Sequence, residues 1–200
     1  PGVGIRAPPV PPRGAGRAFS AGADLRDRVP VPPDPIGQRR FNGRWQRLLE
    51  DLERLPQVTV AEIHGHVIGG AALLAAACDF RVASDDTAIA IPEVAIGIPL
   101  TWAGIPRLAR EIGIARTREL VMTGRRLLGP EAREWGFVHR LCRPEERAAT
   151  VDHLLGELLA QPPGPLAMTT DSLRALGRAL SAPETAWADA DILRWSLRDL

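Results

Sequence analysis

The apolar positions of this chain first recur at helical spacing and then gather in short β-branched runs. Between Asp34 and Pro56 the helical spacing is carried by Ile36, Phe41, Trp45, Leu48, Leu49, Leu52 and Leu55. Asp34 and Pro35 suit a helix cap and a first helical position, and Pro56 ends the pattern. The segment therefore predicts one amphipathic helix.

The next stretch changes from a β-branched run to small apolar residues. Val58–Ile63 predicts a strand, and Ala71–Ala77, which contains no breaker, predicts a helix buried on most sides. Gly69-Gly70 forms the expected turn between them. Glycines allow close approach of a ligand, and the first N–H groups of a helix are unpaired donors at the positive end of its dipole. Such a turn can hold a negative oxygen, although a Gly-Gly turn before a core helix is more often only a tight connection.

The rest of the chain alternates β-prone runs with helical patterns and then becomes helical. The further predicted strands are Phe80–Ala83, Thr87–Ile91 and Phe137–Leu141. A loop over Pro92–Leu100 precedes the remaining predicted helices, which are Trp102–Ile112, Ala115–Thr123, Pro130–Trp135, Pro144–Ala160, Ala167–Leu180 and Pro183–Leu197. This order predicts an α/β core over residues 1–140, with the proline-rich residues 1–13 irregular, and a helical C-terminal region over residues 141–200.

Composition and charge narrow the class of protein. With 200 residues, 45% of them hydrophobic, the chain can bury one sizeable core. Its 25 basic residues are all arginine, are interspersed with acids and leave a net charge of +1, so we expect neither nucleic acid nor a membrane as partner. Cys78 and Cys142 are too few for a disulfide framework, which favours a reducing compartment, and we expect a cytoplasmic protein without a signal or membrane span.

Several familiar kinds of site find no support in the sequence. His64, His66 and Cys78 can be imagined as metal ligands, but alternate residues of a strand point to opposite faces and a fourth ligand is missing. Gly14-Ala-Gly16 lacks the third glycine of a dinucleotide loop, and no serine lies in a GxSxG motif. We therefore expect no metal and no cofactor.

Five phrases, in matching order and spacing, resemble the crotonase, or enoyl-CoA hydratase/isomerase, family. They are AFSAGADL (18–25), HGHVIGG (64–70), CDFRV (78–82), PEVAIG (92–97) and LVMTG (120–124). Several motifs agreeing in register are far more specific than any one of them. The resemblance implies a crotonase-like ββα spiral core that lacks the family's first strands, followed by helices that mediate oligomerisation. It further implies a homotrimer or hexamer that acts on acyl-CoA in fatty acid metabolism.

The resemblance also implies an oxyanion hole. It assigns the two donors to the backbone N–H groups of Ala23 and Gly70, which would stabilise the enolate-like oxygen of a CoA thioester. Each such donor typically contributes on the order of 3 kcal/mol. Contacts to CoA, largely through backbone atoms, are implied for Ala21, Ala23, Asp24, Leu25 and Gly70.

The acid/base group is where the sequence departs from the hydratases it resembles. Hydratases of this family carry two glutamates; the first position holds Leu73 here and the second holds Glu93. Adding water to C3 and a proton to C2 uses both carboxylates, whereas shifting a double bond from C3 to C2 needs one base. Glu93 is thus the expected catalytic acid/base, its pKa raised by an apolar pocket. The reaction is either an isomerase-like shift or hydration of a 2-enoyl-CoA by a single glutamate.

The sequence predicts the roles of other acidic and aromatic residues less specifically. Two alternative functions also stay open. Glu62 is expected to be a strand-face residue, while His66 and Trp102 suit either the acyl pocket or ordinary packing. One alternative is a non-catalytic acyl-CoA binder, which Leu73 keeps open. The other is a structural subunit that pairs with an intact paralogue, which the short N-terminal region keeps open.

Overall fold

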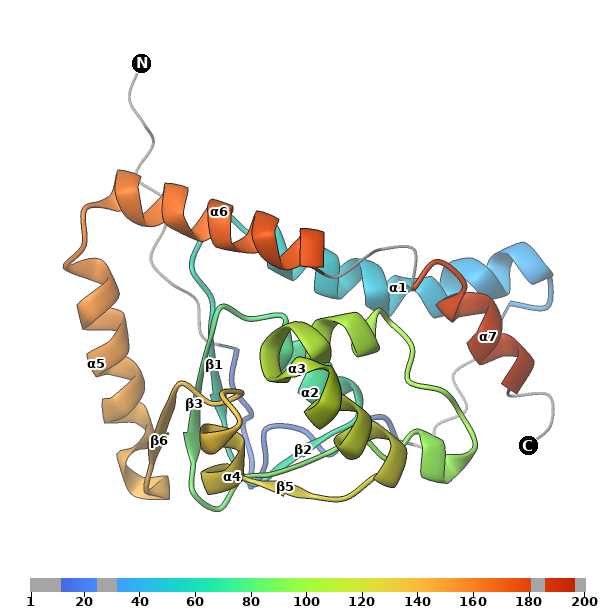
Figure 1. Cartoon of the computed structure of the whole chain (residues 1–200), viewed down its shortest axis with the longest axis horizontal. Coiled ribbons are helices and arrows are strands. Elements are labelled where there is room, and N and C mark those ends of the chain that lie inside the picture. The colour runs from blue at the N-terminus through green and yellow to red at the C-terminus, as the bar shows by residue number, and fades with distance from the viewer. Residues whose placement is uncertain (1–11, 25–31, 181–185, 197–200) are drawn as a thin grey trace.

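The computed structural model describes residues 12–24, 32–180 and 186–196, and its elements alternate strands and helices before ending in helices (Figure 1). Their order is α1 (Pro35–Glu53), β1 (Val60–Ile63), β2 (His66–Ile68), α2 (Gly70–Ala76), β3 (Phe80–Ser84), β4 (Ala88–Ala90), η1 (Val94–Ile96), α3 (Gly104–Thr123), β5 (Leu127–Leu128), α4 (Gly129–Glu134), β6 (Arg140–Cys142), η2 (Pro144–Glu146), α5 (Arg147–Leu159), α6 (Pro163–Leu180) and α7 (Asp189–Ser196).

The six described strands form two sheets of three strands each. One sheet has the parallel order β1-β3-β6, and the other has the order β2-β4-β5, in which only the β4–β5 pair is antiparallel. The first two turns of the chain each place one strand in each sheet and then a helix, so that β3 pairs with β1 and β4 pairs with β2. Strand β5 then joins the second sheet, and β6 joins the first sheet after α4. This arrangement agrees with the expected ββα spiral core.

The segment before α1 extends both sheets at their outer edges. Arg13 forms a parallel bridge with Glu62 of β1, and Ser20 forms one with Val67 of β2. The carbonyl of Pro12 accepts the N–H of Glu62 at 3.1 Å. Residues 12–20 therefore supply backbone partners where β1 and β2 would otherwise present unpaired groups.

Helix α1 is the amphipathic helix that the sequence predicts. Its N-cap is Asp34, whose carboxylate accepts the N–H of Gly37 at 2.7 Å, and Pro35 occupies the first turn. Within α1, Leu49 is buried, whereas Trp45 and Leu48 remain partly exposed. Figure 1 shows α1 beside α7, and the amide of Asn42 donates to the carbonyl of Ala190 at 3.1 Å.

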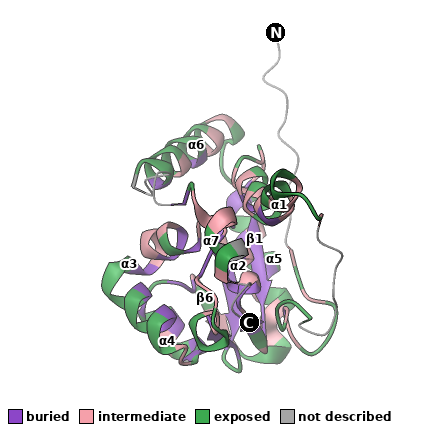
Figure 2. Ribbon diagram, turned by 90° about the vertical axis from the view of Figure 1, so that its right-hand side faces the viewer, coloured by how far each residue is buried: buried purple, intermediate pink, exposed green. Residues whose placement is uncertain are grey.

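The core forms where the two sheets meet α2 and α3, as the buried colouring of Figure 2 shows. Helix α2 is buried on most sides, as expected from its run of small residues, and Leu73 within it is 1% exposed. A second apolar cluster joins α5 to the sheet of β1 and β3 through Val60, Val82 and Leu154. These contacts fix the glycine turn before α2 against rigid elements on both sides.

The structure corrects several expected element boundaries. The short strand β2 lies between β1 and the glycine turn, and β5 was not expected either. Helix α3 begins at Gly104 instead of Trp102, because Trp102 and Ala103 have positive φ angles. It continues to Thr123 through a break at Gly113, whose φ of 80° separates the two helices that the sequence predicts.

The C-terminal boundaries also move. The last strand covers Arg140–Cys142, because Phe137 and Val138 pack into the core before the chain reaches β3. Helix α6 starts at Pro163 rather than Ala167, and α7 starts at Asp189; the expected helix positions 183–185 lie outside the described residues. Strand β6 crosses the division proposed between residues 140 and 141, and that division stays a prediction. None of the described helices has the length and apolar character that spanning a membrane requires.

Candidate active site

A cavity of about 390 Å³ opens between the glycine turn, the Pro92–Trp102 loop and α1. Its walls are predominantly apolar and come from residues 20–23, Trp45, Leu48, Leu49, residues 68–71, Leu73, Leu74, Pro92, Glu93, Ile96, Ile98 and residues 100–102. Ala23, Gly70 and Glu93, which lie far apart in the sequence, are therefore brought together around one space. Of the described residues that line it, Glu93 is the only acid.

The glycine turn requires its two glycines for different reasons. Gly69 has φ 58° and ψ −123°, and a Cβ placed there would lie 2.8 Å from Oε1 of Glu93. A Cβ at Gly70 would lie 2.3 Å from Cζ3 of Trp102. Gly70 is also the first residue of α2, so its N–H has no partner within the helix. The turn thus brings a carboxylate close to a helix N–H group.

Ala23 reaches the same cavity because the preceding segment is aligned along β2. The N–H of Ser20 donates to the carbonyl of His66, and the carbonyl of Ser20 accepts the N–H of Ile68, each at 3.1 Å. Gly22, with φ 89°, lies so close to Ile68 that a Cβ would be 3.0 Å from the carbonyl oxygen of that residue. This path places Ala23 beside the glycine turn.

The remaining implied CoA contacts differ in position. Ala21 lines the cavity with Ala23. Asp24 is exposed and does not line it, and Leu25 lies outside the described residues. The implied contacts of Asp24 and Leu25 with CoA stay predictions.

The carboxyl group of Glu93 is buried in apolar surroundings. Its Oε2 is buried and has no hydrogen-bond partner among the described residues. Burial raises the pKa of Glu93 above its usual value, the direction expected of a carboxyl group in an apolar pocket. The carbonyl of Glu93 accepts the N–H groups of Ile96 and Ile98 at 3.1 and 3.0 Å, which fixes the backbone from which the side chain extends. This carboxyl group can accept or donate a proton within the cavity.

Two further residues clarify the acid/base assignment. Leu73 lines the cavity with an apolar side chain, so the position where hydratases of the family have their first glutamate carries no titratable group here. Glu62 lies on β1, is buried outside the cavity, and its Oε1 accepts from Nε of Arg147 at 2.7 Å. Glu62 is thus a strand-face residue in an ion pair, as expected.

Trp102 is part of the cavity wall, a role that the sequence left undecided. Its ring stacks on Trp45 with centroids 5.5 Å apart, and its backbone has a φ of 63°. His66, the other undecided residue, is exposed on β2 and does not line the cavity. The imagined metal ligand His64 instead places Nε2 2.9 Å from the carbonyl oxygen of Gly16, and among the described residues no group of His, Cys, Asp or Glu is arranged to hold a metal ion.

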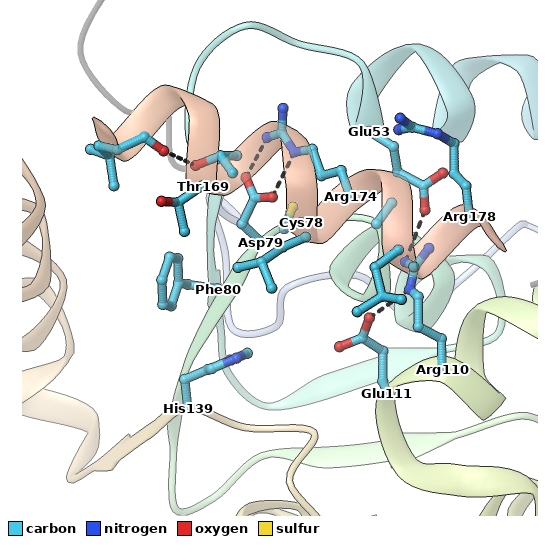
Figure 3. Close-up of a pocket in the computed structure, with 16 residues that line it drawn as sticks. Glu53, Cys78, Asp79, Phe80, Arg110, Glu111, His139, Thr169, Arg174 and Arg178 are labelled. Carbon is cyan, nitrogen blue, oxygen red and sulfur yellow. Dashed lines mark hydrogen bonds and ion pairs between the residues drawn. The ribbon is translucent and has the colours of Figure 1, made fainter. Parts of the chain in front are cut away.

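A second cavity, of about 420 Å³, lies beneath α6, and charged residues form part of its lining (Figure 3). Asp79 pairs there with Arg174, and Arg110 pairs with both Glu53 and Glu111. Burial raises the pKa of Cys78, at the floor of this cavity, to about 12, so its thiol stays protonated. These ion pairs join α1 to α3 and α6 to the segment before β3. The expected site residues Ala23, Gly70 and Glu93 line the other cavity.

Comparisons with known proteins identify the family of this chain. Residues 13–195 match the family model described as enoyl-CoA hydratase/isomerase. The mitochondrial enoyl-CoA hydratase domain-containing protein 2 of Mus musculus is 36% identical over 149 residues, which cover 72% of this chain and 50% of that protein. The mitochondrial methylglutaconyl-CoA hydratase of Rattus norvegicus is 32% identical over 157 residues, 78% of this chain and 49% of that protein.

A solved structure is similar over nearly the whole chain. A Thermobifida fusca protein assigned as an enoyl-CoA hydratase, in complex with CoA, superposes with a TM-score of 0.80 at 28% identity, over 98% of this chain and 79% of its own. The chain spans about half the length of the curated relatives described above. The family match covers both the spiral core and the helical region, and the chain belongs to the enoyl-CoA hydratase/isomerase family.

Proposed function

We propose that this protein binds an acyl-CoA thioester in the cavity of Ala23, Gly70 and Glu93 and stabilises its enolate. The N–H groups of Ala23 and Gly70 would donate to the thioester oxygen, and Glu93 would move the proton. One observation carries the proposal. The Glu93 side chain lies against Gly69, next to the first N–H of α2, and its Oε2 is buried without a hydrogen-bond partner among the described residues. Donors fixed in advance favour the charged enolate over the neutral thioester.

A single carboxylate favours a double-bond shift. Glu93 would remove a proton from C2 of a 3-enoyl-CoA, and the electrons of that C–H bond would form the dienolate on the thioester oxygen. The protonated Glu93 would then deliver the same proton to C4, which leaves a C2=C3 double bond. Atoms and charge balance without a second acid, a metal or a redox cofactor. The leucine at position 73 supports this reaction over one that needs two carboxylates.

Hydration of a 2-enoyl-CoA by a single glutamate is the second candidate. The similarity to proteins described as hydratases favours it. In that reaction Glu93 would activate water for attack on C3 and the proton would return to C2. The oxyanion donors would act in the same way on the same enolate oxygen, so the two candidates differ in the acid/base steps alone.

The setting of the reaction is also a proposal. A neighbour with bound CoA supports an acyl-CoA ligand, and the apolar cavity wall suits an apolar acyl group. We infer a homotrimer or hexamer in the cytoplasm. Large apolar side chains exposed on α6 and α7, among them Met168, Leu176 and Trp195, support association through the helical region.

The test is turnover of 3-enoyl-CoA and trans-2-enoyl-CoA by the purified protein and by Glu93→Gln. We expect isomerisation by the native protein and a loss of about 100-fold or more in kcat for the variant, because an amide cannot carry the proton. Glu134→Gln, an exposed glutamate on α4, is the matched control and should keep the native rate. Acyl-CoA binding without turnover of either substrate would contradict the proposal and support a non-catalytic binder.

A further inference from the structure

The cavity wall contains a strained turn that the proposed proton transfer does not use. Trp102 and Ala103 have φ angles of 63° and 55°, and among the described residues they are the only non-glycine residues with positive φ. Such conformations cost free energy and persist only where neighbouring groups hold them. The turn directly precedes α3 and borders the cavity through the Trp102 ring.

Hydrogen bonds with Arg107 and Asp189, from different parts of the chain, hold this turn. The carbonyl of Trp102 accepts from Nη1 of Arg107 at 2.7 Å, and Arg107 is itself paired with Glu53 of α1. The N–H of Ala103 donates to Oδ2 of Asp189 at 2.7 Å. Asp189 belongs to α7, so the C-terminal helix reaches back to fix the turn.

The ring of Trp102 is confined as tightly as its backbone. It stacks on Trp45 of α1, and its six-membered edge lies over Gly70, at the position that a Cβ of that residue would fill. The indole Nε1 is buried and has no hydrogen-bond partner among the described residues. An unpaired buried donor costs free energy, as the strained backbone does, so stability alone does not account for this placement.

We propose that Trp102 determines the length of acyl chain that the enzyme accepts, with Asp189 as the residue that positions it. This inference rests on the proposed function, because an acyl group whose thioester oxygen lies at Ala23 and Gly70 begins at the edge of the Trp102 ring. The apolar wall then continues through Leu49, Leu74 and Ile98. The indole therefore limits the space for methylene groups beyond the reacting carbons.

The test compares kcat/KM for substrates of four to twelve carbons in the native protein and in Trp102→Ala. We expect the variant to raise the ratio of long-chain to short-chain kcat/KM by at least tenfold, since each methylene that finds apolar space contributes about fourfold. Trp102→Phe, which keeps an aromatic ring on Trp45, should shift it less. Asp189→Ala should shift the ratio in the same direction, and Asp189→Asn, which keeps an oxygen acceptor, should restore the native ratio.

Two further readouts keep the outcome decisive. The pH profile of kcat should stay the same in Asp189→Ala, because Asp189 does not take part in proton transfer. If the native protein shows no turnover, dissociation constants of saturated acyl-CoAs of the same lengths give the corresponding ratio, so failure of the proposed function is distinguished from failure of this inference. An unchanged ratio in folded Trp102→Ala, or in Asp189→Ala should the former not fold, would overturn it.

Discussion

At the scale of single residues, the carboxyl group of Glu93 combines its proposed role in proton transfer with a cost in stability. Burial raises its pKa, so the folded state binds a proton more tightly than the unfolded state does. The stability that this group contributes is fully present below its unfolded pKa and is lost as pH rises through the raised folded pKa. Above that raised pKa the native protein holds an ionised carboxylate in an apolar cavity, which costs stability.

We predict that Glu93→Gln increases the free energy of unfolding relative to the native protein at pH 8. The gain should largely disappear at about pH 4, just below the usual pKa of a glutamate, where the native side chain is mostly neutral in both states. Urea denaturation at the two pH values measures the difference. An equal effect of the substitution at both values would show that burial does not raise the pKa of Glu93.

Leu73 provides a second prediction at this scale. Leu73→Glu places a second carboxylate on the cavity wall, and we expect hydration of 2-enoyl-CoA to rise relative to isomerisation of 3-enoyl-CoA. Leu73→Gln is the control, because it has nearly the same polar burial cost without a titratable group. A rise in hydration in both variants, or in neither of two folded variants, would argue that a missing carboxylate does not limit water addition.

At the scale of elements, the sequence predicts the helices and strands whose local patterns extend over enough residues to be recognised. Asp34 and Pro35 mark the start of α1, and the breaker-free run of small residues marks α2. Strands β2 and β5 escape prediction because three and two residues are too few for a periodic pattern, and both exist by pairing with β4. Local preference does not encode such pairing.

The candidate site likewise contains parts that the sequence predicts and parts that depend on contacts between distant residues. The family resemblance locates Ala23, Gly70 and Glu93, and the structure brings all three to one cavity. The strained turn at Trp102 and Ala103 could not be predicted, because residues of these types disfavour positive φ. Its support comes from Asp189, 86 residues further along the chain.

The pairing of β3 with β6 gives a prediction on pH and stability. Nδ1 of His139 accepts the N–H of Arg81 at 3.1 Å, which requires a neutral ring, and burial is the first cause that lowers the pKa of His139 to about 4. The stability that this group contributes is present above its unfolded pKa, near 6.5, and is lost as pH falls toward 4.

We therefore expect the native protein to lose up to about 3 kcal/mol of unfolding free energy through His139 between pH 7 and pH 4. His139→Asn should be less stable than the native protein at pH 7 and should lose less on acidification. Thermal or urea unfolding across this range measures both slopes. Equal slopes for the two proteins would contradict the assigned pKa shift.

At the scale of the whole molecule, the C-terminal helices are tied to the core by ion pairs and backbone contacts. Arg174 of α6 pairs with Asp79 (Figure 3). It also donates to the carbonyl of Gln57 at 2.8 Å. Asp79 also accepts the N–H of Thr59 at 2.7 Å. A single arginine thus joins α6 to the chain on either side of β1.

We predict that Arg174→Ala lowers the free energy of unfolding by about 3 kcal/mol, because it leaves Asp79 partly buried without its cation. Arg178→Ala, an exposed arginine one turn further along α6, is the control and should have an effect below about 0.5 kcal/mol. Chemical denaturation at neutral pH compares them. Equal losses for both arginines would show that α6 is not anchored through Asp79.

The central claim, that Ala23 and Gly70 stabilise a thioester enolate while Glu93 moves its proton, is tested most directly by hydrogen exchange at C2 of butyryl-CoA in D₂O. This measurement requires neither a double bond nor water addition, so it does not depend on which reaction the enzyme completes. We expect the native protein to exchange the C2 protons, and Glu93→Gln to bind butyryl-CoA equally well but exchange them at least about 100-fold more slowly. Binding of butyryl-CoA by the native protein without exchange, or equal exchange by both proteins, would contradict the account.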